Sequence, residues 1–328
     1  MTQRNITAED LYRFSIVGDP QVSPDGTRIA YVVKTIDRET NAYRTSIWLA
    51  PVTGGLGAAQ PFTSDGRNPR WSPDGTKLAF VSDRAGPLPT PIGDEGAGKR
   101  DKRLGKGKPQ IWVIPVQGGE ARQLTFAEHG AGAPLWSPDG TRVLFTADVG
   151  DFPEVPEHDG KPEPRVHRVK DIIYRFNGAG YIYQNRTHLF VIPAEGGVAQ
   201  QLTDGDWNDG DATWSPDGRQ IAFASDRHAD RWRMMRGEIW LMNADGSNQH
   251  ALLSEENFNY IEPAWSPDGQ QIACFGHAQF GSGGHADVFV VRPGASPRNL
   301  TEHATIEFGD SVGSDMRNDH AASTPRWA

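Results

Sequence analysis

The sequence predicts an all-β protein, a β-propeller built from repeated four-stranded blades. Three observations predict this fold: a tetrapeptide that recurs five times, alternating apolar segments that follow it, and a high content of turn-forming residues. The chain of 328 residues contains 37 glycines and 24 prolines, and its apolar runs are only a few residues long. Such a composition suits many short strands joined by tight turns better than long helices.

The recurring tetrapeptide is Ser-Pro-Asp-Gly, which predicts a tight turn at the tip of a hairpin. Its five copies lie at 23–26, 72–75, 137–140, 215–218 and 266–269. Proline presets φ at the second position, aspartate can bond the local backbone, and glycine accepts the positive φ that other residues resist. Each copy is therefore expected to join the first strand of a blade to the second.

The segments around each tip predict the other strands of a blade. An apolar residue precedes every tip, at Val22, Trp71, Trp136, Trp214 and Trp265. Alternating segments such as 77–81 and 220–224 follow the tips and predict second strands. Third strands are predicted at 47–49, 111–113, 189–191, 239–241 and 288–290, and fourth strands end in Thr63, Thr125, Thr203, Ser254 and Thr301. Four such strands cannot bury both faces alone, so each unit must stack on its neighbours.

The spacing of the tips predicts two insertions on one face of the propeller. Successive tips are 49, 65, 78 and 51 residues apart, against roughly 40 to 50 in familiar propeller repeats. The extra residues fall between second and third strands, at about 84–109 in the second blade and 149–186 in the third. In a meander of four strands these connections share one face with the links to the next blade, so we expect function on that face.

The two ends of the chain predict a helical lead and an incomplete blade. Residues 7–10, Thr-Ala-Glu-Asp, fit a capping box that opens a short helix. We assign 1–18 to an amino-terminal lead and 19–328 to the propeller. Residues 324–327, Thr-Pro-Arg-Trp, repeat the pattern of 68–71 ahead of a tip. We therefore expect five complete blades and the start of a sixth, in a fragment of a longer protein.

Composition argues against several functional classes. The single cysteine, Cys274, leaves no intramolecular disulfide, and the first residues lack the apolar stretch of a secretory signal, so we expect a cytoplasmic location. No run approaches about 18 apolar residues, so no membrane partner is expected. A net charge of −9 argues against nucleic acid as a partner, because that affinity needs clustered cations. The ten histidines lack metal-ligand spacing, and we expect neither a metal nor a cofactor.

Three features together resemble a known family. They are the repeated Trp-Ser-Pro-Asp-Gly blades, the lead Ile-Thr-Ala-Glu-Asp-Leu-Tyr-Arg-Phe at 6–14, and the segment 171–197. With them the chain resembles the amino-terminal propeller of prolyl oligopeptidase-type serine peptidases, most of all the acylaminoacyl-peptidase branch. The resemblance covers essentially the whole chain. It implies a seven- or eight-bladed propeller followed by an α/β-hydrolase domain with a Ser, Asp and His triad, and neither the last blades nor that domain lies in residues 1–328.

The same resemblance implies that the propeller is a substrate filter. It would cover the active site of a carboxy-terminal hydrolase domain in the same parent chain, and admit short peptides rather than folded proteins. We therefore expect no catalytic residue in this chain and a serine peptidase as its parent. A homo-oligomer is compatible with the sequence. The alternative is a TolB-like propeller that binds another protein, because Trp-Ser-Pro-Asp-Gly repeats are also typical of such propellers.

The third insert contains the residues that we expect to contact a peptide substrate or the hydrolase domain. Arg168, Tyr174, Arg175 and Tyr181 combine guanidinium forks with aromatic rings, which suit a peptide carboxylate and the side chains beside it. The alternative is that the rings pack the insert and the arginines form surface pairs. The basic second insert is either a solvated segment or an attractor of acidic peptides.

Three further patterns are interpreted as structural. Residues 309–313, Gly-Asp-Ser-Val-Gly, match a nucleophile elbow, but the residues after Ser311 lack the apolar face of a packed helix, so we expect a surface loop. Glu255 and Glu256 resemble the paired glutamates with which dipeptidyl-peptidase relatives hold an amino terminus, but they lie in an ordinary loop between blades. The acidic run at 204–211 lacks the spacing and the closing glutamate of an EF-hand.

Overall fold

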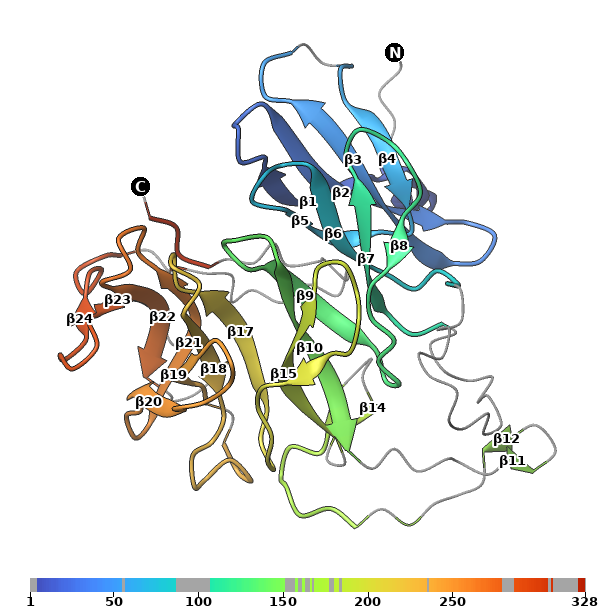
Figure 1. Ribbon diagram of the computed structural model, residues 1–328. Helices are drawn as coiled ribbons and strands as arrows, with labels where there is room; N and C mark the ends of the chain where they lie inside the picture. Colours follow the sequence, from blue (N-terminus) through green and yellow to red (C-terminus); the bar gives the residue numbers. More distant parts are fainter. Residues whose placement is uncertain are drawn as a thin grey trace, which may run out of the picture. The chain divides into compact units, whose positions relative to one another are not determined.

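The fold consists almost entirely of β-strands, grouped into five four-stranded sheets and two short hairpins (Figure 1). The computed structural model describes residues 5–54, 57–86, 107–150, 157–158, 161–162, 166, 168–176, 180–182, 185–234, 236–278, 286–305, 308 and 324–327. No helix in this described part of the chain is long and apolar enough to cross a membrane. The predicted all-β class with four-stranded blades is confirmed.

Each four-stranded sheet is a meander in chain order. The first contains β1 (Ile16–Val22), β2 (Arg28–Asp37), β3 (Ala42–Pro51) and β4 (Gln60–Ser64). The second contains β5 (Arg67–Trp71), β6 (Lys77–Ser82), β7 (Gln110–Pro115) and β8 (Arg122–Gln123). The third contains β9 (Ala131–Trp136), β10 (Arg142–Gly150), β15 (Asn185–Pro193) and β16 (Gln200–Gln201). The fourth contains β17 (Asp209–Trp214), β18 (Gln220–Ser225), β19 (Glu238–Asn243) and β20 (His250–Leu253), and the fifth β21 (Phe258–Trp265), β22 (Ile272–Ala278), β23 (Asp287–Val291) and β24 (Arg298–Asn299).

Both long insertions fall between second and third strands, as the tip spacing predicts. The second insert separates β6 from β7, and residues 87–106 of it lie outside the described residues. The third separates β10 from β15 and contains two hairpins, β11 (Glu157–His158) with β12 (Lys161–Pro162), and β13 (Arg175–Phe176) with β14 (Gly180–Tyr181). The expectation that both inserts emerge on one face stays a prediction.

The amino-terminal lead forms the expected short helix, which is a 3-10 helix, η1 (Ala8–Arg13). The carboxylate of Asp10 accepts a hydrogen bond from the backbone N–H of Thr7 at 2.9 Å, as in the capping box that the sequence predicts. The first strand already begins at Ile16, two residues before the end of the lead assigned from the sequence.

All five Ser-Pro-Asp-Gly tips form one type of turn. In the second tip the Ser72 hydroxyl donates to the Asp74 carboxylate at 2.6 Å, and the same carboxylate accepts from the backbone N–H of Thr76 at 3.0 Å. The backbone N–H of Lys77 donates to the Ser72 hydroxyl oxygen at 2.9 Å. The tip glycines have φ between 69° and 70°, a region that favours glycine. The turn chemistry predicted from the tetrapeptide is confirmed.

A bulge interrupts each first strand three residues before its tryptophan or valine. The residues there share a positive φ of 46° to 54°, and they are Asp19, Asn68, Ala133, Asp211 and Glu262. Strand pairing shifts register at this point in β1, β5, β17 and β21. Four of the five residues are followed by proline, which has no backbone N–H to offer to the ladder. This bulge was not predicted from the sequence.

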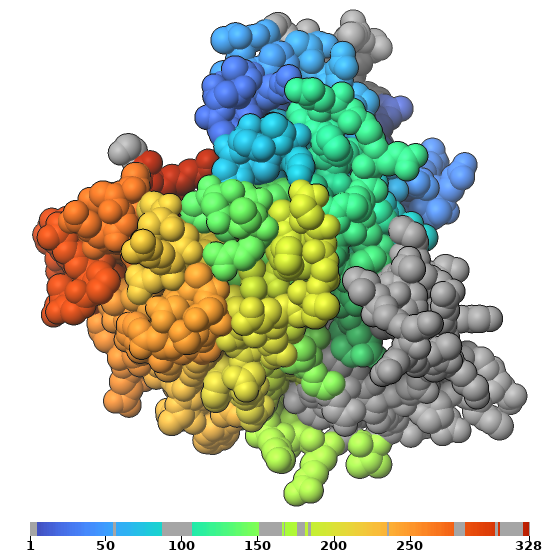
Figure 2. All heavy atoms as spheres, viewed as in Figure 1, coloured from blue at the N-terminus to red at the C-terminus, as the bar shows by residue number. Residues whose placement is uncertain are grey.

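Apolar side chains fill the space between adjacent sheets. Between the first and second sheets, Ile47 packs with Leu78, Phe80 and Trp112. Between the fourth and fifth, the buried apolar residues come from β18, β19 and β20 on one side and from β21, β22 and β23 on the other. Figure 2 shows the atoms of these two sheets, coloured yellow to orange-red, side by side on the face in view. By its contacts the chain divides into two compact units, one with the first two sheets and the other with the last two.

Three of the repeated tryptophans donate a hydrogen bond to the backbone of the preceding sheet. The indole N–H of Trp71 donates to the carbonyl oxygen of Gln21 at 2.9 Å, and that of Trp136 to Arg70 at 3.0 Å. Trp327 makes the equivalent bond to Ala264 at 3.1 Å. The position of Trp327 against the fifth sheet therefore matches that of Trp71 against the first, as the repeated pattern at 324–327 predicts.

Candidate functional site

The hairpin β13–β14 of the third insert brings together three of the four predicted contact residues. Arg175 pairs with Tyr181 across the hairpin, and the backbone N–H of Ile182 donates to the Tyr174 carbonyl oxygen at 2.9 Å. The rings of Tyr174 and Tyr181 stack with centroids 6.2 Å apart. The Arg175 guanidinium lies 5.6 Å from the centroid of the Tyr181 ring. The structure thus forms an exposed cluster of Tyr174, Arg175 and Tyr181, which we call the hairpin cluster.

The fourth predicted contact residue, Arg168, is exposed and joins none of these contacts. In the hairpin cluster the two tyrosine residues are 42% and 45% exposed. No carboxylate in the described part of the chain forms an ion pair with Arg175. The rings therefore do pack against each other, but their outer faces and the guanidinium edge are still open to solvent.

The connection between β18 and β19 contacts the segment next to the hairpin cluster. The backbone N–H of Ile172 donates to the Trp232 carbonyl oxygen at 2.8 Å. Arg186, at the start of β15, forms ion pairs with Asp171 at 3.2 Å and with Asp206 at 2.9 Å. Arg231 also forms an ion pair with Asp206. Contacts on both sides of the hairpin therefore fix the direction in which its exposed groups point.

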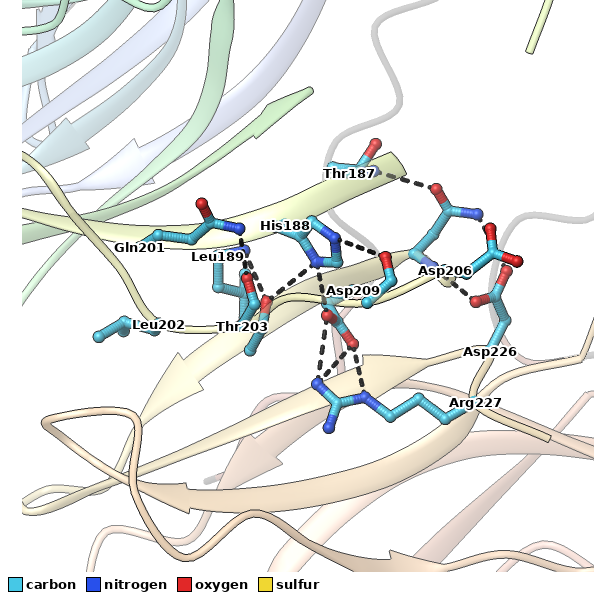
Figure 3. Close-up of polar contacts among 12 residues, drawn as sticks. Thr187, His188, Leu189, Gln201, Leu202, Thr203, Asp206, Asp209, Asp226 and Arg227 are labelled. Atoms are coloured by element: carbon cyan, nitrogen blue, oxygen red, sulfur yellow. Dashed lines mark hydrogen bonds and ion pairs between the residues drawn. The ribbon is translucent and has the colours of Figure 1, made fainter. Parts of the chain in front are cut away.

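A buried network of charged residues lies near the start of β15 and β17 (Figure 3). The Asp209 carboxylate lies 3.0 Å from Nδ1 of His188 and accepts two hydrogen bonds from the Arg227 guanidinium, each of 3.2 Å. His188 and Asp209 are each 1% exposed. The Thr203 hydroxyl accepts from the backbone N–H of Leu189 at 3.0 Å. A buried carboxylate is stable here because a guanidinium fork and an imidazole face it.

Polar residues recur in the third strands, two residues before an aromatic ring. In four sheets they are Gln110, His188, Glu238 and Asp287, and Ser46 takes this place in the first. Each of these four contacts a hydroxyl that follows the fourth strand, as in Thr125 to Gln110 at 2.9 Å, Ser254 to Glu238 at 2.7 Å and Thr301 to Asp287 at 2.7 Å. Sequence reasoning missed this set, although its spacing from Trp48, Trp112, Phe190, Trp240 and Phe289 is constant.

Most fourth strands end one or two residues earlier than the sequence indicates. The reason is that the threonine expected to end the strand bonds through its side chain. The Thr125 hydroxyl oxygen accepts from the backbone N–H of Ile111 at 2.8 Å, and Thr301 accepts from Val288 at 3.0 Å. A hydroxyl thereby takes the place of a backbone carbonyl in the ladder.

The acidic patterns weighed in the sequence have structural partners. Glu255 accepts a hydrogen bond from the Tyr260 hydroxyl at 2.9 Å, and burial together with this bond raises the pKa of Tyr260. Asp206 and Asp209 of the acidic run at 204–211 face arginines, as described above. No group of three or more acidic, histidine or cysteine side chains in the described residues could hold a metal ion. The elbow-like residues 309–313 lie outside the described residues.

A polar cleft of about 570 Å³ lies at the insert-side ends of the first and second sheets. It is lined by Lys34, Tyr43, Arg44, Thr45, Asp65, Arg67, Asp83 and Arg84. Lys34 is only 5% exposed, and Arg67 forms an ion pair with Asp83 at 3.0 Å. Four cations face two carboxylates in this cleft, so its lining carries a net positive charge.

Comparison with known proteins relates the chain to peptidases. The uncharacterized peptidase YuxL of Bacillus subtilis is 32% identical over 225 residues, which cover 67% of this chain and 31% of that protein. The acylaminoacyl peptidase of Pyrococcus horikoshii matches with a TM-score of 0.63 at 20% identity, over 88% of this chain and 39% of that chain. The predicted resemblance to prolyl oligopeptidase-family propellers is confirmed.

The same comparisons confirm the propeller class and also bear on the alternative. A putative TolB from Agrobacterium tumefaciens matches with a TM-score of 0.53 at 18% identity, over 87% of this chain and 80% of that chain. No protein-family model matches the chain. The chain spans about a third of the length of its Bacillus relative. Its similarity to peptidases therefore makes this chain a peptidase-associated propeller. What the whole protein does is taken up as a proposal.

Proposed function

We propose that this chain is the substrate-gating, non-catalytic propeller of a cytoplasmic serine peptidase of the acylaminoacyl-peptidase type. A hydrolase domain in the same parent chain would supply the Ser, Asp and His triad, and the propeller would admit short peptides to it. The relationship to a peptidase supports this proposal, and so does the hairpin cluster, which presents one guanidinium and two rings on a fixed support.

The hairpin cluster has the chemistry for contact with a peptide or with the hydrolase domain. An arginine that lies over an aromatic ring keeps the N–H groups at its edge free, and these can bind both oxygens of a carboxylate. The tyrosines supply apolar area and a hydroxyl for the neighbouring side chain or backbone. A filter that accepts many peptides must recognise what they share, which is their backbone and termini.

The test is Arg175→Ala in the parent peptidase. If Arg175 holds a peptide carboxylate, KM for peptides with a free carboxyl terminus should rise about tenfold or more with little change in kcat, because a charged hydrogen bond contributes ~1.5–3 kcal/mol. Amidated peptides should be affected less. The control is Arg219→Ala, since Arg219 is an 86% exposed arginine next to the fourth tip, and its loss should leave KM unchanged.

Equal losses for free and amidated peptides would show that Arg175 is structural, and unchanged kinetics would remove the hairpin cluster from the binding site. The likeness to a putative TolB favours a second candidate function, a propeller that binds another protein. The reading frame after residue 328 separates the two. A hydrolase domain with its own nucleophile elbow supports a peptidase, whereas a stop soon after the last blade would contradict it.

A further inference from the structure

Two arginines occupy equivalent positions in the second and fourth sheets. Each ends a Ser-Asp-Arg sequence whose serine is the last residue of a second strand, at 82–84 for β6 and at 225–227 for β18. Each guanidinium lies over one ring from the second strand and one from the third. Arg84 is 5.0 Å from the Phe80 ring and 5.3 Å from Trp112. Arg227 is 5.3 Å from Phe223 and 4.7 Å from Trp240.

The two arginines differ in what faces their charge. Arg227 is bound by the buried Asp209 carboxylate through two hydrogen bonds of 3.2 Å. By strand register Asp209 pairs with Ser225, and the corresponding place before Arg67 in the second sheet is taken by Gly66, which has no side chain. The carboxylate that neutralises Arg227 thus has no counterpart in the second sheet.

Arg84 bonds only neutral oxygens in the described part of the chain. Its Nε donates to the Ser82 hydroxyl and one Nη to the Thr63 hydroxyl, each at 2.9 Å, and it also contacts the Ser64 carbonyl oxygen. No described carboxylate forms an ion pair with it. Partial burial lowers the pKa of Arg84, although Asp65 opposes this effect. The guanidinium nevertheless stays charged, as arginine does throughout proteins.

The polar cleft lies beside Arg84 and is built for an anion. Its volume of about 570 Å³ is typical of small-molecule sites, which span roughly 300–1,000 Å³. Asp83 is already paired with Arg67, and Arg44 with Asp37 at 2.6 Å. Lys34, which is buried, also lines the cleft. A partly desolvated positive charge is stabilised when a carboxylate joins it, as Asp209 joins Arg227.

We propose that the polar cleft binds the carboxylate of a ligand on Arg84. The assignment of that ligand as a short peptide rests on the proposed function, whereas the charge argument does not. A carboxyl terminus and an aspartate or glutamate side chain offer the same chemistry, so the experiment distinguishes these two sources.

Calorimetric titration of the 328-residue chain tests the proposal directly. Three probes are compared: N-acetyl-Gly-Gly as the free acid, its amide, and N-acetyl-Gly-Asp-Gly as the amide. We expect at least one carboxylate-bearing probe to bind tenfold or more tightly than N-acetyl-Gly-Gly amide. A preference for the first probe identifies a carboxyl-terminal source, and a preference for the third identifies a side chain. Equal binding of all three, or none at millimolar concentration, would overturn the proposal.

Variants then assign the binding to Arg84. Arg84→Gln keeps the stem and loses the charge, so it should remove the tenfold preference, whereas Lys77→Gln at the tip end of the same sheet should not. Asp83→Asn takes an exposed carboxylate out of the cleft and frees Arg67, so it should tighten binding several-fold. Circular dichroism checks that each variant folds. If Arg84→Gln does not fold, Asp83→Asn still tests the proposal, because unchanged binding in that variant would contradict an anion-binding site in the cleft.

The result is independent of the peptidase proposal. Binding is measured without a hydrolase domain, and Arg219→Ala, which removes an exposed arginine outside the cleft, should leave it unchanged. Loss of carboxylate binding in Arg175→Ala but not in Arg84→Gln would contradict this inference and support the hairpin cluster instead.

Discussion

Burial determines what each acid of the run at 204–211 does. Asp204 and Asp209 belong to the same short polar segment, and their residue type alone suggests the same role. Asp204 is exposed, whereas Asp209 is buried at the start of β17 with a guanidinium and an imidazole against it. A carboxylate at the buried position is held by its partners and is not free to bind a ligand.

Asp209→Asn should therefore destabilise the fold, because it leaves Arg227 charged and buried without its partner. Breaking a buried ion pair typically costs about 3–5 kcal/mol, and Asp204→Asn, the exposed control, should change the free energy of unfolding by less than about 0.5 kcal/mol. Urea unfolding of both variants at neutral pH measures the difference. Similar unfolding midpoints for the two variants would show that the network contributes nothing.

The bulged first strand is the element that distinguishes these sheets from regular meanders. Its left-handed residue is glycine in none of the five sheets, although φ is near 50° in all of them. Such a conformation brings Cβ close to the following carbonyl group in any residue other than glycine. The third sheet places Ala133 there, whose side chain is exposed and can make no local hydrogen bond as aspartate or asparagine can.

Ala133→Gly should consequently stabilise the protein by about 1 kcal/mol, since it relieves a left-handed residue at little loss of packing. Ala251→Gly is the matched control. Ala251 is an exposed alanine of β20 without a positive φ, and its replacement should cost about 0.5–1 kcal/mol. Thermal unfolding followed by circular dichroism compares them. A loss of stability in both variants would mean that the bulge is not strained.

Over the whole molecule the five tips make stability depend on acid pH. Hydrogen bonds from the tip serine and from the backbone hold the pKa of Asp25 and of Asp139 down to about 2, and the same bonds lower the pKa of Asp74, Asp217 and Asp268. A carboxyl with a lower pKa in the folded state stabilises that state above its unfolded pKa of about 3.9. The contribution is lost as the pH falls from about 4 towards 2.

The melting temperature should accordingly be constant from pH 7 to about 5 and fall steeply between pH 4 and 2. A double variant, Asp25→Asn with Asp139→Asn, should melt lower at pH 7 and lose less on acidification than the parent chain. Asp204→Asn, which alters no tip, should follow the parent curve. Parallel curves for the double variant and the parent would indicate that the tip carboxylates do not drive the acid response.

Features that depend on neighbouring residues could be predicted from the sequence alone. The five tips, the strands around them and the places of both inserts follow from turn chemistry and alternation, which act over a few residues. The combination of guanidinium groups and aromatic rings in the third insert also pointed to Tyr174, Arg175 and Tyr181, which the structure brings together in one hairpin. Local patterns could not show that Arg168 joins none of their contacts.

The pairing of distant strands determines which polar residues are buried and what each one faces. Arg84 and Arg227 end the same tripeptide and stack on equivalent rings, so the local sequence makes them alike. Their difference comes from positions 66 and 209, which strand pairing brings to equivalent places from more than 15 residues away. The Asp209 carboxylate neutralises Arg227, whereas Gly66 offers no charge to Arg84, which lines a cleft. Burial and charge pairing differ here because they depend on the register between strands and not on the order of residues within one strand.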